Sequence, residues 1–294
     1  YFLAQGWDGS NNEIDLVTKT VEPRGDEKEL AEITDLIGSY TTNFASSSAG
    51  RAKNVITGVG KVDGTILYPG EEFDLAKTVS PFTQENGYEL AGAYQNGTVV
   101  ESFGGGICQV ATTLYNAVIR AELEITMRFN HSMLVHYVEP SMDAAIAGNY
   151  KDLKFKNNLD APVYIEGYCS GGIIYFNVYG KETRPSNREI SFESETVSKT
   201  DPKVQFTMDA SLTAGSVSVT QSGQSGCIAQ LWKIVKVDGK QQSRDLFNKS
   251  NYQATPKLIT IGTKDATSET LSALKAAITI GDEAKVRSAA AGLK

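Results

Sequence analysis

A cysteine that directly follows a glycine run is the residue best suited to carry out chemistry. Gly104, Gly105 and Gly106 lead into apolar residues at helical spacing, and Cys108 falls in the first turn of the expected helix. Unpaired N–H groups and the helix dipole would stabilise a thiolate there, so we expect the pKa of Cys108 to lie below the ~8.5 of free cysteine. The glycines would also let a substrate carbonyl approach those N–H groups as an oxyanion hole. The alternative is a small apolar residue packed at a tight strand–helix junction.

A thiolate nucleophile needs a proton acceptor, and the chain holds only two histidines, His131 and His136. Both lie near two expected strands, residues 125–129 and 133–138. Because the histidines are five residues apart, their rings would face opposite sides of a continuous strand. Only one of them can then partner Cys108, and we choose His131 because it is nearer a strand end. The alternative is a structural histidine bonded to the backbone.

The imidazole in turn needs an acceptor that fixes its orientation, as in other nucleophile–base–acid triads. Asp143 and Asp152 are the downstream candidates. Each has a competing structural role, because Asp143 is also suited to capping a turn and Asp152 to capping the expected strand 153–155. The sequence leaves the choice between the two carboxylates open.

Two arginines flank these segments and are suited to clamping a substrate carboxylate. The alternative for each is a surface salt bridge. The candidate substrate-binding residues are Arg51, Gly104, Gly105, Gly106, Gln109, Arg128 and Ser132.

Composition narrows the function classes. The chain has 28 basic and 35 acidic residues, a net charge of −7, which argues against binding to nucleic acid or to an anionic membrane. Three cysteines and two histidines without CxxC or HExxH spacing predict neither a metal site nor a cofactor. Cys169 and Cys227 are expected to be unpaired packing residues, with a disulfide between them as the alternative. No apolar run approaches the ~18 residues of a membrane span.

A chain of 294 residues predicts two domains. We expect an α+β domain with a mixed sheet and a long helix carrying Cys108, followed by a small elongated all-β domain and a short helical C-terminus. The expected divisions are residues 1–35 (linker or end of an upstream domain, with a helix leading inwards), 36–183 (α+β domain), 184–199 (linker), 200–264 (β domain) and 265–294 (helical segment).

Several segments between about residues 36 and 183 resemble, in the right order, the VanW family of bacterial cell-wall proteins. They are Arg51–Ile56, Leu67–Phe73, Gly87-Tyr88, GGGICQVATTLYNAVIRAELEI at 104–125, Arg128–Ser132, Tyr137–Pro140, Asp143-Ala144 and Asp152–Asn157. Residues 200–264 resemble the five-glycine wall-associated domain. The glycines that carry this second resemblance are Gly215, Gly223, Gly226, Gly239 and Gly262.

The first resemblance implies an L,D-transpeptidase-like enzyme that forms 3→3 peptidoglycan cross-links. It implies Cys108 as the acyl-enzyme nucleophile, His131 as its base, and Asp143 or Asp152 as the supporting acid. The partners would be peptidoglycan stem peptides, with wall glycans as a further candidate. We expect an extracytoplasmic location, in the cell wall or anchored to the membrane through a segment outside these residues. The alternatives are a non-catalytic wall-binding protein with an accessory role in glycopeptide resistance, and a cysteine peptidase or carboxypeptidase acting on stem peptides.

Overall fold

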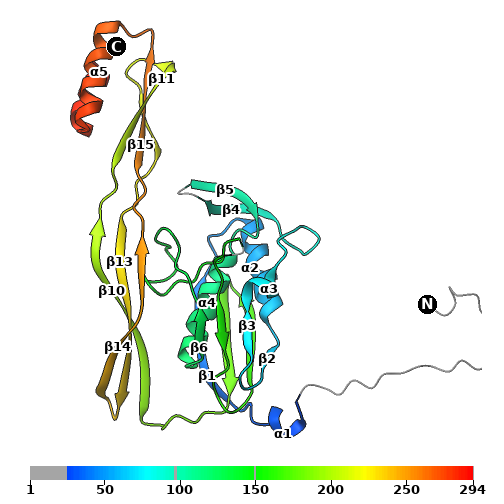
Figure 1. Ribbon diagram of the computed structural model, residues 1–294. Coiled ribbons are helices and arrows are strands. Elements are labelled where there is room, and N and C mark those ends of the chain that lie inside the picture. The colour runs from blue at the N-terminus through cyan, green and yellow to red at the C-terminus, as the bar shows by residue number, and fades with distance from the viewer. Residues whose placement is uncertain (1–24, 96–97, 149, 294) are drawn as a thin grey trace, which may run out of the picture.

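The computed structural model describes residues 25–95, 98–148 and 150–293 as two strand-rich units that stand side by side (Figure 1). The first unit runs from β1 (Asp35–Asn43) to β9 (Ile173–Gly180) and the second from β10 (Arg188–Thr200) to the C-terminal helices. Residues 1–24, which the sequence analysis assigns to a linker or an upstream domain, lie outside the described residues. The short helix α1 (Glu27–Leu30) leads into β1 and begins at a capping box made by Asp26 and Glu29.

The main sheet of the first unit has the order β1-β9-β8-β2, with β8 at Val163–Ser170 and β2 at Thr65–Leu67. Side chains alternate along β9, so that Ile174, Phe176 and Val178 point into the core. Helices α2 (Ala49–Val62) and α4 (Ile107–Arg120) pack against this sheet and against each other.

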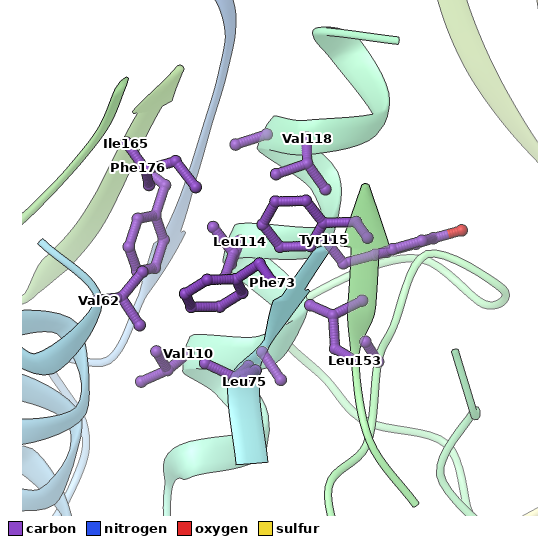
Figure 2. Packing of buried hydrophobic residues seen from close by; sticks show 14 of the residues in the cluster. Val62, Phe73, Leu75, Val110, Leu114, Tyr115, Val118, Leu153, Ile165 and Phe176 are labelled. Carbon is purple, nitrogen blue, oxygen red and sulfur yellow. The ribbon is translucent and has the colours of Figure 1, made fainter. Parts of the chain in front are cut away.

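The core between these layers is filled by aliphatic and aromatic side chains. Val110, Leu114 and Val118 of α4 belong to the same buried cluster as Phe176 and Ile165 of the sheet (Figure 2). All five side chains are buried, so this interface fixes where α4 begins and which way its first turn faces.

Smaller antiparallel pairings complete the first unit. The sheet β3-β7-β6 combines β3 (Glu72–Asp74), β7 (Lys154–Lys156) and β6 (Glu124–Met127), and α3 (Leu75–Val79) follows β3. The hairpin of β4 (Leu90–Gln95) and β5 (Thr98–Phe103) ends directly before the glycine run. The expectation of a mixed sheet is wrong for this unit, because its described strand pairs are all antiparallel.

The second unit is long and thin (Figure 1). Its sheet β10-β13-β14 includes β13 (Gly226–Val237) and β14 (Lys240–Tyr252). A further sheet, β11-β15-β12, is built from β11 (Val204–Thr213), β15 (Lys257–Lys264) and β12 (Val217–Gln221), and its β11–β15 pair is parallel. Helices α5 (Ser268–Ile280) and α6 (Glu283–Ala291) pack at the end of that sheet, separated by a turn at Gly281 with φ of 78°.

Two sequence-based assignments need correction. Residues 184–199 are not a linker, because β10 pairs with β13 from Arg188 onwards. Residues 133–138 are not a strand, because the segment between β6 and β7 crosses towards the second unit as an irregular loop (Figure 1). We call residues 128–146 the bridging loop. In the part of the chain that the structure describes, the helices are too short or too polar to span a bilayer.

Candidate active site

The glycine run turns the chain from β5 into α4. Gly104 and Gly106 adopt φ values of 80° and 112°, which only glycine adopts without strain. A side chain at Gly105 would bring a Cβ to 2.8 Å from the carbonyl oxygen of Ala91. The buried amide of Asn54, on α2, holds the run by donating to the carbonyl oxygen of Gly105 at 3.0 Å. No side chain in the described residues caps α4. The N–H groups of Ile107 and Gln109 donate to the carbonyl oxygens of Gly104 and Gly106 at 3.1 and 2.9 Å, so among the described contacts the Cys108 N–H is the one left without an acceptor in this turn.

One stripe of α4 binds the second half of the bridging loop. Cys108, Thr112 and Asn116 recur every four residues, and therefore lie one above another on the helix. The Cys108 Sγ donates to the carbonyl oxygen of Ile146 at 3.4 Å, and the Asn116 amide donates to that of Met142 at 2.6 Å.

Thr112, between them, both donates to and accepts from the backbone of Ala144, at 3.1 and 3.0 Å. Successive contacts are four residues apart on the helix, a rise of about 6 Å, and two residues apart on the extended loop, a rise of about 6.6 Å. The two spacings match, so each of the three helix residues meets one loop residue. This register places Ile146 beside the start of α4 and Asp143 beside the turn between Thr112 and Asn116.

Asp143 orients the His131 ring. The Asp143 Oδ2 atom lies 2.6 Å from His131 Nδ1 and also accepts the His131 backbone N–H at 2.7 Å. The carboxylate is 1% exposed and the imidazole 13% exposed. Nε2 is then the ring nitrogen left to interact with the half-buried Cys108 thiol, which shares a side-chain hydrogen bond with His131. The three side chains form the cysteine, histidine and aspartate of a triad.

The electrostatics of this triad favour a thiolate paired with an imidazolium. Burial alone would raise the pKa of the Cys108 thiol, but the hydrogen bond to His131 and the charge of its ring hold that pKa below its ordinary value. Burial disfavours the imidazolium, yet hydrogen bonds to Asp143 and Cys108 raise the pKa of His131 to about 9. Burial likewise acts against the Asp143 carboxylate, but its contacts with His131 and the charge of Arg128 keep its pKa low. The thiol is therefore poised to lose its proton at a lower pH than an ordinary cysteine.

Comparisons with known proteins agree with the division into two units. Residues 50–179 match the family model described as VanW like protein, and residues 192–264 match the model of the G5 domain. The chain thus contains a VanW-like domain followed by a G5 domain. The resemblances seen in the sequence to the VanW family and to the five-glycine wall-associated domain are thus confirmed. We call the first unit the VanW-like domain and the second unit the G5 domain.

Two curated proteins are similar to parts of the chain. The uncharacterized protein YoaR of Bacillus subtilis (strain 168) is 34% identical over 183 residues, which is 62% of this chain and 59% of YoaR. The vancomycin B-type resistance protein VanW of Enterococcus faecalis (strain ATCC 700802 / V583) is 27% identical over 110 residues, 35% of this chain and 40% of VanW. The matched part of the chain thus spans about three fifths of YoaR and two fifths of VanW.

Two solved G5 structures are also similar to part of the chain. The G5 domain of an IgA1 protease is 26% identical, with a TM-score of 0.19, and the match covers 26% of this chain and 94% of that one. The structure of HP0197-G5 is 24% identical, with a TM-score of 0.16, over 25% of this chain and 99% of that one.

Within the VanW-like domain, the arginines and Gln109 are engaged in ways that the sequence analysis did not predict. Arg51 donates to Ser47 Oγ at 2.6 Å and to Gln109 Oε1 at 2.8 Å. The Gln109 amide is buried and its nitrogen donates to Thr42 Oγ1 and the Asn43 carbonyl oxygen, so the prediction that it binds substrate is wrong. Its contacts fix the start of α4 to β1.

Arg128 also serves the protein rather than a substrate. Its guanidinium is 7% exposed and pairs with Asp143 Oδ1 at 2.9 Å, while its Nε donates to the Asp143 carbonyl oxygen at 2.7 Å. The predicted substrate clamp and its alternative, a surface salt bridge, are both wrong for this residue. Ser132 is exposed beside the triad, and its carbonyl oxygen accepts the Gln253 N–H of the G5 domain at 2.7 Å.

The structure decides between the two candidate carboxylates. Asp152 does not contact His131. Its Oδ1 atom instead accepts the N–H groups of Ala76 and Leu153, at 2.9 and 2.7 Å, and so holds α3 to β7. Burial raises the pKa of Asp152, as expected for a carboxylate partly removed from water. The prediction that Asp152 supports His131 is therefore wrong, and Asp143 is the carboxylate that contacts the ring.

An Asp152→Ala variant should therefore lose stability without losing the triad. We expect its free energy of unfolding, from urea denaturation followed by circular dichroism, to fall by about 1–2 kcal/mol, because the Ala76 N–H loses its acceptor. The His131 pKa, measured by NMR titration of the ring, should match that of the unmodified protein. A displaced His131 pKa would show that Asp152 acts on the triad after all.

Sequence reasoning missed the residues that hold the site together. The missed residues are Asn54, Thr112, Asn116 and Tyr137 in the VanW-like domain and Ser250 and Tyr252 in the G5 domain. For Thr112 and Asn116 the sequence does hold a signal, because they are polar residues on an otherwise apolar helix and follow Cys108 at four-residue spacing. Tyr137 contacts Thr112, and burial and the charge of Cys108 raise its pKa well above the ordinary range.

No three His, Cys, Asp or Glu side chains in the described residues are arranged to hold a metal ion. All three cysteines lie in the described residues and are free thiols, so the alternative of a Cys169–Cys227 disulfide is wrong.

Proposed function

We propose that the chain is a peptidoglycan L,D-transpeptidase that acts through a Cys108 thioester. The observation that carries this proposal is the contact chain Cys108–His131–Asp143 at the uncapped start of α4. Similarity to a protein named for vancomycin resistance supports a role related to the cell wall. Stem peptides are the proposed partners, and the proposed location is extracytoplasmic, where those peptides are found.

In the first half-reaction, the Cys108 thiolate attacks the carbonyl carbon of the third residue of a tetrapeptide stem. The oxyanion that forms would be held by the Cys108 N–H at the start of α4. The S–C bond forms, the C–N bond to the terminal D-alanine breaks, and the leaving amine takes the proton of the His131 imidazolium. The stem is left as an acyl group on the sulfur.

In the second half-reaction, the neutral side-chain amine of another stem, a diaminopimelate in our proposal, attacks the thioester carbonyl. The new C–N bond forms, the C–S bond breaks and His131 takes a proton from the attacking nitrogen. The thiolate and the imidazolium are both restored. Asp143 holds the imidazole in the tautomer that both steps need and stabilises its charged form.

Analysis of products from purified disaccharide-tetrapeptides tests this proposal. We expect dimers joined between the third residues of the two stems, together with free D-alanine, and tandem mass spectrometry can locate the bond. A mixture without protein provides the blank. Tripeptides without dimers would replace the proposal by a carboxypeptidase, and cleavage inside the stem by an endopeptidase. Binding of the stems with no new product would leave a non-catalytic wall-binding protein.

A further inference from the structure

One edge strand of the G5 domain faces the active site of the VanW-like domain. Asn248, Ser250 and Tyr252 occupy alternate positions of β14, so their side chains project from the same face. The Asn248 amide donates to Tyr115 Oη at 2.7 Å. Ser250 Oγ accepts from Arg128 Nη1 at 2.9 Å. The backbone joins the same contact, because Asn130 Nδ2 donates to the Asn251 carbonyl oxygen at 3.0 Å.

Tyr252 goes furthest into the site and reaches the triad itself. Tyr252 is 2% exposed, and its hydroxyl donates to Asp143 Oδ1. The hydroxyl oxygen of Tyr252 also accepts the Ser141 N–H at 2.7 Å. Burial and the charge of Asp143 both raise the pKa of Tyr252, so the phenol keeps its proton and remains a donor.

The Asp143 carboxylate is therefore held by donors from both domains. His131 supplies both contacts to Oδ2, and Arg128 supplies one contact to Oδ1 at 2.9 Å. Tyr252 supplies the other contact to Oδ1 and is the donor that comes from the G5 domain. Two donors on each oxygen leave the carboxylate little freedom to rotate away from the imidazole.

We infer that Tyr252 is a positioning residue of the active site, and that the G5 domain is needed to complete the triad of its neighbour. This inference rests on the proposed function and extends it, because a domain associated with wall attachment would also tune the chemistry. The phenol draws charge from Asp143 and fixes its orientation, and through it that of His131.

A Tyr252→Phe variant of the full chain tests this role. Removing the O–H leaves more negative charge on Asp143, so both pKa values of the coupled Cys108–His131 pair should rise. The lower one is measured from the pH dependence of thiol alkylation and the upper one by NMR of the His131 ring, with His136 as an internal reference. A loosened interface without this electrostatic role would instead move the two values towards each other. We also expect acyl transfer to slow roughly tenfold.

An Asn248→Ala variant is the matched control, because it removes contacts between the domains without touching Asp143. It should lower the melting temperature and leave both pKa values in place. A ring-fluorinated tyrosine at position 252 keeps the shape and strengthens the donor, so both values should fall, and this result stands even where Tyr252→Phe fails to fold. Unchanged values in both Tyr252 variants would overturn the inference. An ordinary thiol pKa in the unmodified protein would instead count against the proposed function.

Discussion

A Cys108→Ala variant should form neither acyl-enzyme nor cross-linked dimer, with turnover at least about 10⁴-fold below that of the unmodified protein. Its methyl group cannot attack the stem carbonyl, and no other thiol is placed to replace it. The dimers are quantified by liquid chromatography of the muropeptides, at equal protein concentration and after confirming that the variant folds.

Cys169→Ala is the matched control for this experiment. The Cys169 thiol is also half-buried, but burial raises its pKa to about 11 and no imidazole opposes that effect. This variant should keep full turnover. Dimer formation by the Cys108→Ala variant at the normal rate would remove Cys108 from the mechanism.

A His131→Ala variant should raise the pKa of the Cys108 thiol above the ordinary value of about 8.5. The imidazolium is the main group that lowers this pKa, with a smaller effect from the Ile146 backbone, whereas burial and the charge of Asp143 both raise it and both remain in the variant. The sign of the change is therefore fixed. Alkylation of the thiol by iodoacetamide near pH 6 should become far slower, and transpeptidation should fall about 10³-fold or more.

His136→Ala controls for the loss of an imidazole in general. His136 is exposed and lies on the bridging loop outside the triad. Its replacement should leave both the alkylation profile and the turnover unchanged. If His131→Ala behaved like His136→Ala, the base of the mechanism would have to be sought elsewhere.

The position of Cys108 could be predicted from the sequence because its setting is local. A glycine run before an apolar helical pattern defines a strand–helix junction, and Cys108 falls in the first turn wherever the rest of the chain lies. His131 does contact Cys108, but the reason for choosing it does not hold. The parity argument assumed a strand over residues 133–138, whereas the loop there is irregular and the ring is placed by its contacts with Asp143.

The choice between Asp143 and Asp152 could not be predicted, because it depends on tertiary register. Both aspartates follow the histidine within a short stretch of chain, and only the docking of residues 142–146 on α4 brings one of them to the ring. The contact between Tyr252 and Asp143 was even harder to predict from the sequence, because 109 residues separate the two.

The misassigned linker has a similar physical cause. Along β10 only alternate side chains are partly covered, as at Ile190 and Phe192, and the rest are exposed and polar. The sequence of a strand with so little apolar surface resembles that of a linker. The strand is stabilised mainly by its backbone pairing with β13.

Intact-mass analysis of the unmodified protein, quenched within its first turnovers on a tetrapeptide donor without acceptor, tests the central claim most directly. We predict a species heavier by one tripeptide acyl group, with the added mass on the proteolytic fragment that contains Cys108 and sensitive to hydroxylamine, as a thioester is. Release of D-alanine with no acyl group on Cys108 at any time point would contradict the account.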